Sequence, residues 1–137
     1  MNSGSRSMFA AIISLLAGAA DLATGCLLVF APTLALQLMR VPPRDPVMVS
    51  FVGAFVGAVG FSYLWALANW RRTGSPIVLR EVWKFTAIVR IAAGLFSAWS
   101  IASGALEPGW WSVPAFDLSL AALQLALVRR GWLGGAR

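Results

Sequence analysis

The chain has 137 residues, of which 59% are hydrophobic and only 12% are charged, and its formal net charge is +6. A soluble domain usually carries about 25% charged residues, so this composition excludes an ordinary soluble domain and indicates an integral membrane protein. The lack of histidine and the single cysteine, Cys26, also exclude a histidine-ligated metal or haem centre and an intrachain disulfide.

The first predicted element is a membrane-spanning helix over residues 8–31. A helix needs about 20 apolar residues to cross the hydrocarbon core, and this run is long enough although it contains Asp21. The run also resembles a lipoprotein signal that ends at Cys26. Because Asp21 interrupts the apolar stretch and "LLVFAP" continues it after the cysteine, we expect a retained helix and not a cleaved signal.

Three further spans follow, separated by short connections. After Pro32, the residues "TLALQLMR" are typical of a short amphipathic segment at the membrane interface, and the next residues, "VPPRDP", cannot continue a helix. The remaining spans are predicted at residues 47–70, 82–106 and 112–128. Short connections favour antiparallel neighbours. The predicted fold is therefore all-α, a single transmembrane domain over residues 1–137 that forms an up-and-down four-helix bundle.

Basic residues predict the orientation of this bundle. Eight of them lie in the two tails and around the connection between the second and third spans: Arg6, Arg71, Arg72, Arg80, Lys84, Arg129, Arg130 and Arg137. The other side carries only Arg40 and Arg44. Because cytoplasmic segments are enriched in lysine and arginine, both termini are predicted to be cytoplasmic. The basic cluster from Arg71 to Arg130 is also a candidate site for anionic lipid headgroups or an acidic partner.

Each predicted span has one face of small or polar residues, because residues three or four apart share a helix face. These faces comprise Ser14, Gly18, Asp21 and Gly25; Gly53, Gly57 and Gly60; Thr86, Arg90, Gly94, Ser97 and Gly104; and Asp117, Ala121 and Gln124. Such faces allow helices to pack closely in lipid, so we predict that they point into the bundle. Gly53 and Gly57 also form a GxxxG motif, for which an oligomer contact is the alternative.

Three ionisable residues are predicted to meet inside the membrane. At ~1.5 Å per residue, Arg90 lies ~12 Å from the cytoplasmic boundary, and Asp21 and Asp117 lie ~20 Å and ~22 Å from it. A lone charge at mid-membrane costs ~2.5–3.5 kcal/mol. We therefore predict that Arg90 pairs with one or both aspartates, with Gln124 as a further hydrogen-bond partner. Two interpretations are open: the cluster fixes the register of the bundle, or it marks a path for a proton, ion or small solute.

Five of the tryptophans fall near the predicted ends of the spans. Trp110 and Trp111 lie at one boundary, and Trp70, Trp83 and Trp132 lie at the other. Because indole favours the headgroup region, all five are interpreted as interfacial anchors.

The sequence lacks the usual patterns of catalytic chemistry. Cys26 has no base beside it in the chain, and no glycine loop followed by lysine is available to hold a phosphate. Asp45 and Glu107, which lie in different connections, do not form a carboxylate pair. We therefore predict no enzymatic activity, no cofactor, no metal site and no nucleic-acid partner.

Two segments, "FVGAFVGAVGFSYLWAL" and "VWKFTAIVRIAAGLF", resemble the small bacterial four-span proteins grouped as DoxX-like. The resemblance covers residues 32–104 and rests on length, glycine-rich second and third spans, and a basic residue near the start of the third. It implies a four-helix bundle in the bacterial inner membrane, of a kind that is sometimes accessory to membrane redox systems. It assigns no catalytic residue to this chain.

The sequence thus supports two functional hypotheses. The first is a non-catalytic accessory or scaffold subunit that contacts membrane lipids and either other membrane subunits or copies of itself. The alternative is a small transporter or permeation unit built on Asp21, Arg90 and Asp117.

Overall fold

The computed structural model describes residues 3–42 and 44–133, and every regular element within them is helical. The elements are α1 (Ser3–Phe30), α2 (Pro32–Leu38), α3 (Pro46–Thr73), α4 (Ile77–Ala102), the 3₁₀ helix η1 (Pro108–Trp111) and α5 (Ser112–Arg129). Pro43 in the predicted first connection and Arg137 on the predicted basic side lie outside the described residues. The helices α1, α3 and α4 and the segment formed by η1 and α5 are each long and apolar enough to cross a membrane. The chain is therefore a small multi-pass membrane protein with an all-α, four-helix fold.

The bounds of α4 differ from those of the predicted third span. α4 begins at Ile77, before the predicted start at residue 82, so the charged residues Arg80 and Glu81 are already helical. It ends at Ala102, because Gly104 has φ of 77° in the turn that follows, a value outside the α-helical range. Gly104, which was predicted on the inward face of the third span, lies outside that helix.

Local signals in the sequence explain where α3 begins and ends. The Asp45 side chain accepts a hydrogen bond from the backbone N–H of Val47 at 2.8 Å, which satisfies one of the donors that open a helix. Pro46 occupies the first turn, where its missing N–H breaks no helical hydrogen bond. At the other end, Gly74 has φ of 70° and its N–H donates to the Trp70 carbonyl, which stops α3 and turns the chain into α4.

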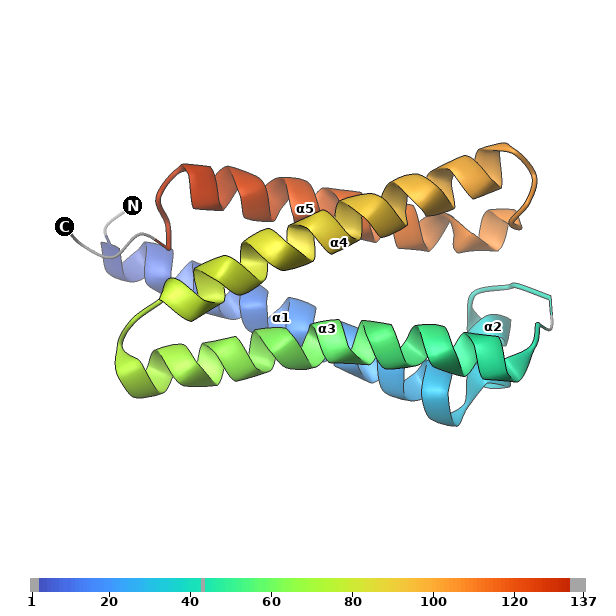
Figure 1. The fold of residues 1–137 in the computed structure, drawn as a ribbon, viewed down its shortest axis with the longest axis horizontal. Coiled ribbons are helices and arrows are strands. Elements are labelled where there is room, and N and C mark those ends of the chain that lie inside the picture. The colour runs from blue at the N-terminus through green and yellow to red at the C-terminus, as the bar shows by residue number, and fades with distance from the viewer. Residues whose placement is uncertain (1–2, 43, 134–137) are drawn as a thin grey trace.

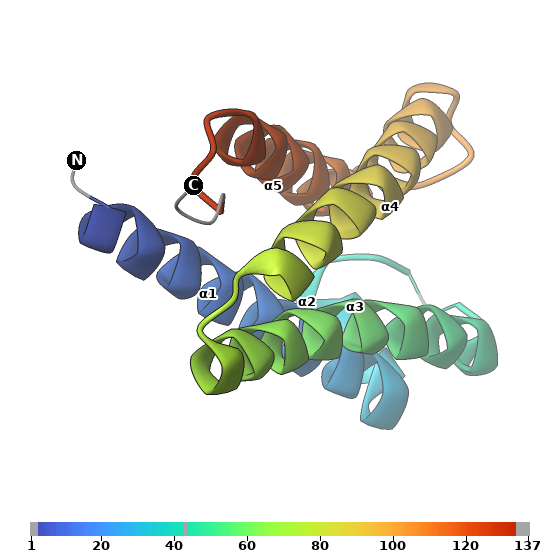
Figure 2. The same cartoon turned by 60° about the vertical axis from the view of Figure 1, so that its left-hand side comes forward.

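The long helices form two antiparallel pairs, α1 with α3 and α4 with α5 (Figure 1). Figure 2 shows the same pairing from a second direction, with the α4–α5 pair above the α1–α3 pair. Of the long helices in the described part of the chain, only α3 and α4 bring their backbones close together across the two pairs. The other contacts between the pairs are therefore made by side chains.

The start of α1, the end of α5 and the connection from α3 to α4 meet at one end of the bundle, which we call the terminal end. Its apolar core consists of Ala10, Tyr63, Ala66, Leu79, Trp83, Leu127 and Leu133. Phe9 and Trp132 add an edge-to-face ring contact with centroids 5.3 Å apart. The described basic residues that were predicted to share one side of the membrane belong to these segments.

At the opposite end, α2 folds back against α1 and α3 (Figure 1). A second apolar core forms there from Leu28, Ala35, Leu36, Val41 and Val49, and Trp110 packs against it. A Cβ atom at Gly109 would lie only 2.5 Å from the Met39 carbonyl oxygen, so the connection from α4 to α5 requires glycine at this close approach. Arg44 forms an ion pair with Glu107. These contacts join the α4–α5 connection to the α1–α3 pair.

The Arg44–Glu107 pair predicts a pH-dependent contribution to stability. The backbone N–H of Glu107 and then the Arg44 guanidinium lower the pKa of this carboxyl. A carboxyl whose pKa is lower in the folded state stabilises the protein above its unfolded pKa of about 4.3, and that contribution is lost as pH falls through the folded pKa. Glu107→Gln should therefore lower the thermal midpoint slightly at pH 7 and leave it unchanged below the folded pKa, as measured in mild detergent.

Arg44→Gln is the matched control for this prediction, because it removes the other member of the same ion pair. At pH 7 the double variant should lower the thermal midpoint by no more than either single variant does, since all three variants remove the same ion pair. If Glu107→Gln lowered the thermal midpoint equally at neutral and acidic pH, the ionised Glu107 carboxylate would not be the source of the stabilisation.

Candidate functional site

The faces predicted to point inward are largely buried in the structure. On α1, Ser14, Gly18, Asp21 and Gly25 are all buried, and Thr86, Arg90 and Gly94 are buried on α4. On α5, Ala121 and Gln124 are buried while Asp117 is partly buried. The helical spacing of these residues therefore determines which face of each helix points into the bundle.

Arg90 lies at the centre of a charged triad with Asp21 and Asp117. One terminal guanidinium nitrogen, Nη2, pairs with Asp21 on α1, and the other, Nη1, pairs with Asp117 on α5. The Arg90 side chain is 4% exposed, against 8% for Asp21 and 15% for Asp117. The planar guanidinium suits two carboxylates because its donors point in fixed, separate directions. Arg90 thereby connects α1 of one helix pair to α4 and α5 of the other.

Aromatic rings cover the guanidinium of Arg90. Its central carbon lies 5.3 Å from the centroid of the Phe116 ring and 5.8 Å from that of the Tyr63 ring. Phe116 is partly exposed on α5, so its ring separates the charge from the surrounding lipid. A cation over an aromatic face gains about 0.5–2 kcal/mol, more where it is desolvated.

Tyr63 of α3 connects the triad to a second set of polar groups. Its hydroxyl lies 2.7 Å from the hydroxyl oxygen of Thr86. The Thr86 hydroxyl donates to the Val82 carbonyl at 2.8 Å, so it accepts the proton of Tyr63. The Tyr63 oxygen then accepts from the Gln124 amide and from the Arg90 Nε at 3.5 Å. Gln124 was predicted to contact Arg90, and the structure instead links the two through Tyr63.

A third polar contact joins the pairs closer to the terminal end. The indole N–H of Trp83 on α4 donates to the Ser14 hydroxyl oxygen on α1 at 2.9 Å. Trp83 is 0% exposed, so the prediction that it is an interfacial anchor is wrong. Its N–H finds its partner inside the protein because Ser14 lies on the inward face of α1. We call the whole set the polar seam: Ser14, Asp21, Tyr63, Trp83, Thr86, Arg90, Asp117 and Gln124.

Removing the Tyr63 hydroxyl tests the polar seam. Tyr63→Phe leaves the fully buried Gln124 amide without its acceptor, and an unsatisfied buried polar group costs about 1–3 kcal/mol. We expect a decrease of that size in the free energy of unfolding, measured by denaturant titration in mild detergent. The double variant Tyr63→Phe, Gln124→Leu should recover part of the loss, because it removes both partners. If Tyr63→Phe were as stable as the unaltered protein, the hydrogen bonds of the Tyr63 hydroxyl would not hold the polar seam together.

The predicted packing glycines lie mainly between α1 and α3. A Cβ atom at Gly53 would lie 2.6 Å from the Leu28 Cβ, and one at Gly18 would lie 2.9 Å from the Tyr63 Cβ. Cβ atoms at Gly25 and Gly60 would overlap the backbone of the facing helix. Gly94 faces the Leu118 side chain of α5, which can move. The GxxxG motif on α3 therefore packs within the chain.

The basic residues predicted to contact headgroups or an acidic partner lie apart from the polar seam. Arg71, Arg72, Arg129 and Arg130 are exposed near the ends of α3 and α5. Arg80 and Lys84 both pair with Glu81 at the start of α4. Exposed pairs of this kind contribute little to stability, so these side chains can exchange Glu81 for another anion.

Searches of known protein families, curated proteins and solved structures find no match to this chain. The function is therefore argued from the residues and their geometry.

Sequence reasoning did not include Tyr63 among the candidate residues. Its position nevertheless carried a signal, because it lies three residues after Gly60 and therefore on the same helix face as the packing glycines. A tyrosine on such a face needs a buried partner for its hydroxyl. In the structure that partner is Thr86, which sequence reasoning had placed on the inward face of the third span.

Proposed function

We propose that this protein is a non-catalytic accessory or scaffold subunit of a larger membrane complex. In this proposal it resides in the bacterial inner membrane with its terminal end in the cytoplasm, and its partners are membrane lipids and other membrane subunits. The observation that supports it best is the mutual pairing of Asp21, Arg90 and Asp117 in the interior. The charged groups in the interior of the spans join the two helix pairs to each other.

The outward surface suits such a role. Large apolar side chains cover the sides of the long helices, among them Phe51, Phe55, Phe61 and Trp65 on α3 and Phe85, Phe96 and Trp99 on α4. Phe51 and Phe55 also stack edge to face with centroids 4.9 Å apart. In a membrane these side chains contact lipid or the helices of a partner, and aromatic side chains are enriched at protein interfaces.

Co-purification tests the accessory role directly. The tagged chain is extracted in mild detergent from its native membrane, and the mass of the assembly is measured. We expect it to elute with a larger complex of defined composition. Elution of the chain alone from gently solubilised membranes, together with uptake activity in liposomes that contain only this protein, would overturn the proposal.

A second candidate, a proton-coupled permeation unit, is favoured by the charge of the triad. Two carboxylates and one guanidinium have a formal charge of −1 when all are ionised. An uncompensated charge is costly inside a membrane, so the triad has a place for one proton. Asp117, which is more exposed than Asp21, is the residue through which such a proton would enter. Intramembrane carboxylates serve as proton relays in known transporters.

The variants Asp21→Asn and Asp117→Asn separate the two candidates, since asparagine still accepts a hydrogen bond from Arg90 but does not titrate. If the protein is a scaffold, both variants should retain the partner complex and show no flux phenotype. Loss of a pH-driven uptake in liposomes, with folding and partner retention unchanged, would instead support permeation. Ser119→Ala, which changes an exposed residue on the same helix as Asp117, is the control for both measurements.

The orientation and the likeness to DoxX-like proteins belong to the same proposal. Of two reporters fused after the last residue, the one that functions only in the cytoplasm should be active, and the one that functions only in the periplasm should be inactive. Purified protein should also bind vesicles that contain anionic lipid more tightly than neutral vesicles, because the basic cluster surrounds the terminal end. A periplasmic reporter signal would reverse the orientation.

A further inference from the structure

A groove of about 430 Å³ lies at the opposite end, between the α1–α3 pair and the α4–α5 connection. Its volume is within the range of about 300–1,000 Å³ that is typical of ligand sites. It is lined by Leu28, Arg44, Asp45, Met48, Val49, Val52, Ala105, Leu106 and Trp110. The start of α3 and the α4–α5 connection, which supply most of this lining, lie at the same end of the molecule in Figure 1.

Along α3, the lining changes from charged to apolar with depth, whereas the lining residues of the α4–α5 connection are apolar. Arg44 and Asp45 precede α3, which begins at Pro46, and Val52 follows about 9 Å further along that helix at ~1.5 Å per residue. Charged groups thus stand at the membrane boundary and aliphatic groups stand inside it. This order matches an amphiphile whose headgroup remains at the boundary and whose chain enters the hydrocarbon region.

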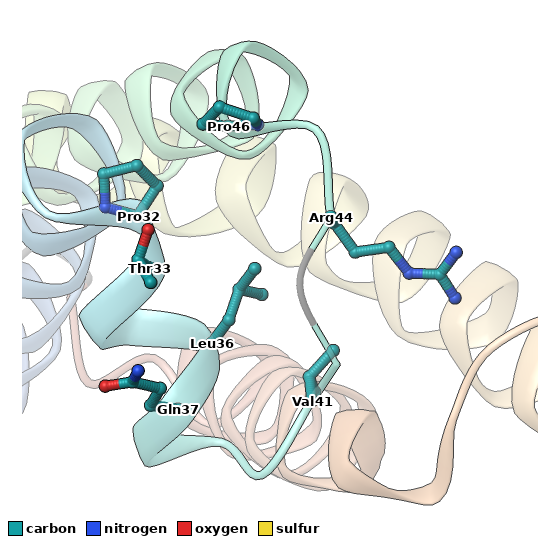
Figure 3. Close-up of a pocket in the computed structure, with 7 residues that line it drawn as sticks. All are labelled: Pro32, Thr33, Leu36, Gln37, Val41, Arg44 and Pro46. Atoms are coloured by element: carbon teal, nitrogen blue, oxygen red, sulfur yellow. The ribbon is translucent and has the colours of Figure 1, made fainter.

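The small pocket beside this groove is a different site. It has a volume of about 60 Å³, enough for only a few water molecules, and it lies between α2 and the start of α3 (Figure 3). Figure 3 shows that the Arg44 side chain extends away from the α2 residues Thr33 and Gln37. On that side it pairs with Glu107. The Arg44 guanidinium therefore belongs to the larger groove.

The charges at the groove identify the headgroup. Arg44 is a cation with donors remaining after it pairs with Glu107, because a guanidinium has five N–H groups. Asp45 is an anion of which one oxygen, Oδ1, caps α3, so its other oxygen can accept. We propose that the groove binds one zwitterionic phospholipid with a primary ammonium, the phosphoethanolamine type, with the phosphate on Arg44 and the ammonium on Asp45.

An anionic headgroup fits less well here than at the terminal end. The charged groups around the groove carry one more negative than positive charge, since Arg44 is accompanied by the carboxylates of Asp45 and Glu107. At the terminal end, by contrast, the exposed basic residues of α3 and α5 outnumber the single acid Glu81. The two ends therefore select different lipids, and this inference is independent of whether the protein is a scaffold or a permeation unit.

Native mass spectrometry tests the proposal. The protein is reconstituted in vesicles of equal parts phosphatidylethanolamine and phosphatidylglycerol, extracted, and stripped progressively with detergent. We expect one phosphatidylethanolamine per chain to remain last. Val52→Trp, which fills the groove, should reduce this retention at least tenfold. Ile88→Trp is the matched control, because Ile88 is exposed on α4 outside the groove, and it should retain the lipid.

Asp45→Asn tests the headgroup separately and does not depend on the folding of Val52→Trp. Asparagine caps a helix as well as aspartate does, so α3 should start normally while the anion is lost. The preference for phosphatidylethanolamine over phosphatidylglycerol should fall several-fold. Equal retention in Val52→Trp and Ile88→Trp, or retention of phosphatidylglycerol as the last lipid in the unaltered chain, would overturn the proposal.

Discussion

Replacing Arg90 with leucine is expected to lower the free energy of unfolding by about 3–5 kcal/mol, the cost of removing one partner from a buried ion pair. The loss arises because Asp21 and Asp117 would remain in the interior without their counter-charge. Since Arg90 also joins α1 to the α4–α5 pair, the variant should unfold at lower denaturant concentration in mild detergent. Chemical denaturation followed by circular dichroism measures this difference.

Two further variants show that charge, and not side-chain volume, causes the loss. Arg90→Lys keeps a cation but lacks the planar fork that reaches both carboxylates, so an intermediate loss is expected. In the triple variant Asp21→Asn, Arg90→Leu, Asp117→Asn, no charge is left uncompensated, and stability should recover in part. If Arg90→Leu were as stable as the unaltered protein, the triad would not hold the helix pairs together.

Replacing Gly60 or Gly25 with alanine is expected to destabilise the contact between α1 and α3. At both positions the new Cβ atom would overlap the backbone of the facing helix, which cannot move aside as a flexible side chain can. Overpacking of this kind costs about 1–3 kcal/mol. The same unfolding titration measures the loss.

Gly57→Ala is the matched control for these variants. Gly57 belongs to the same glycine face, yet a Cβ atom there would lie 3.7 Å from the Gly25 Cα, an ordinary van der Waals distance. Because alanine is about 0.8–1.0 kcal/mol more favourable than glycine in a helix interior, this variant should be neutral or stabilising. Equal destabilisation of Gly57→Ala and Gly60→Ala would contradict the close packing described here.

Hydropathy and spacing were sufficient for the all-helical, four-span fold. An apolar run of about 20 residues has few stable alternatives to a helix in lipid, because every backbone donor and acceptor must be satisfied internally. The start of α3 was predicted to within one residue, because the prolines of "VPPRDP" cannot continue a helix. Its end was predicted three residues too early, because Arg71 and Arg72 are helical although they are charged. The end of α4 was predicted too late, because hydropathy does not detect the turn at Gly104.

The candidate site could be predicted from the sequence only in part. Asp21, Arg90 and Asp117 stood out because charges are rare and costly in a membrane span, and their depths indicated that they could meet. The role of Tyr63 was missed, as was the burial of Trp83, because amphipathic aromatic residues fit both a membrane boundary and a polar interior.

Composition, hydropathy and helical spacing were enough to establish the class of protein, the number of spans, and which face of each helix carries polar residues. These properties follow from the chemistry of single residues and from helical spacing, which are local. Only the three-dimensional arrangement shows that α1 pairs with α3 and α4 with α5, that Arg90 contacts both aspartates, and that a groove lies between the α1–α3 pair and the α4–α5 connection. Those features depend on distances between residues far apart in the chain, such as Asp21 and Arg90, and local spacing along a helix does not give such distances.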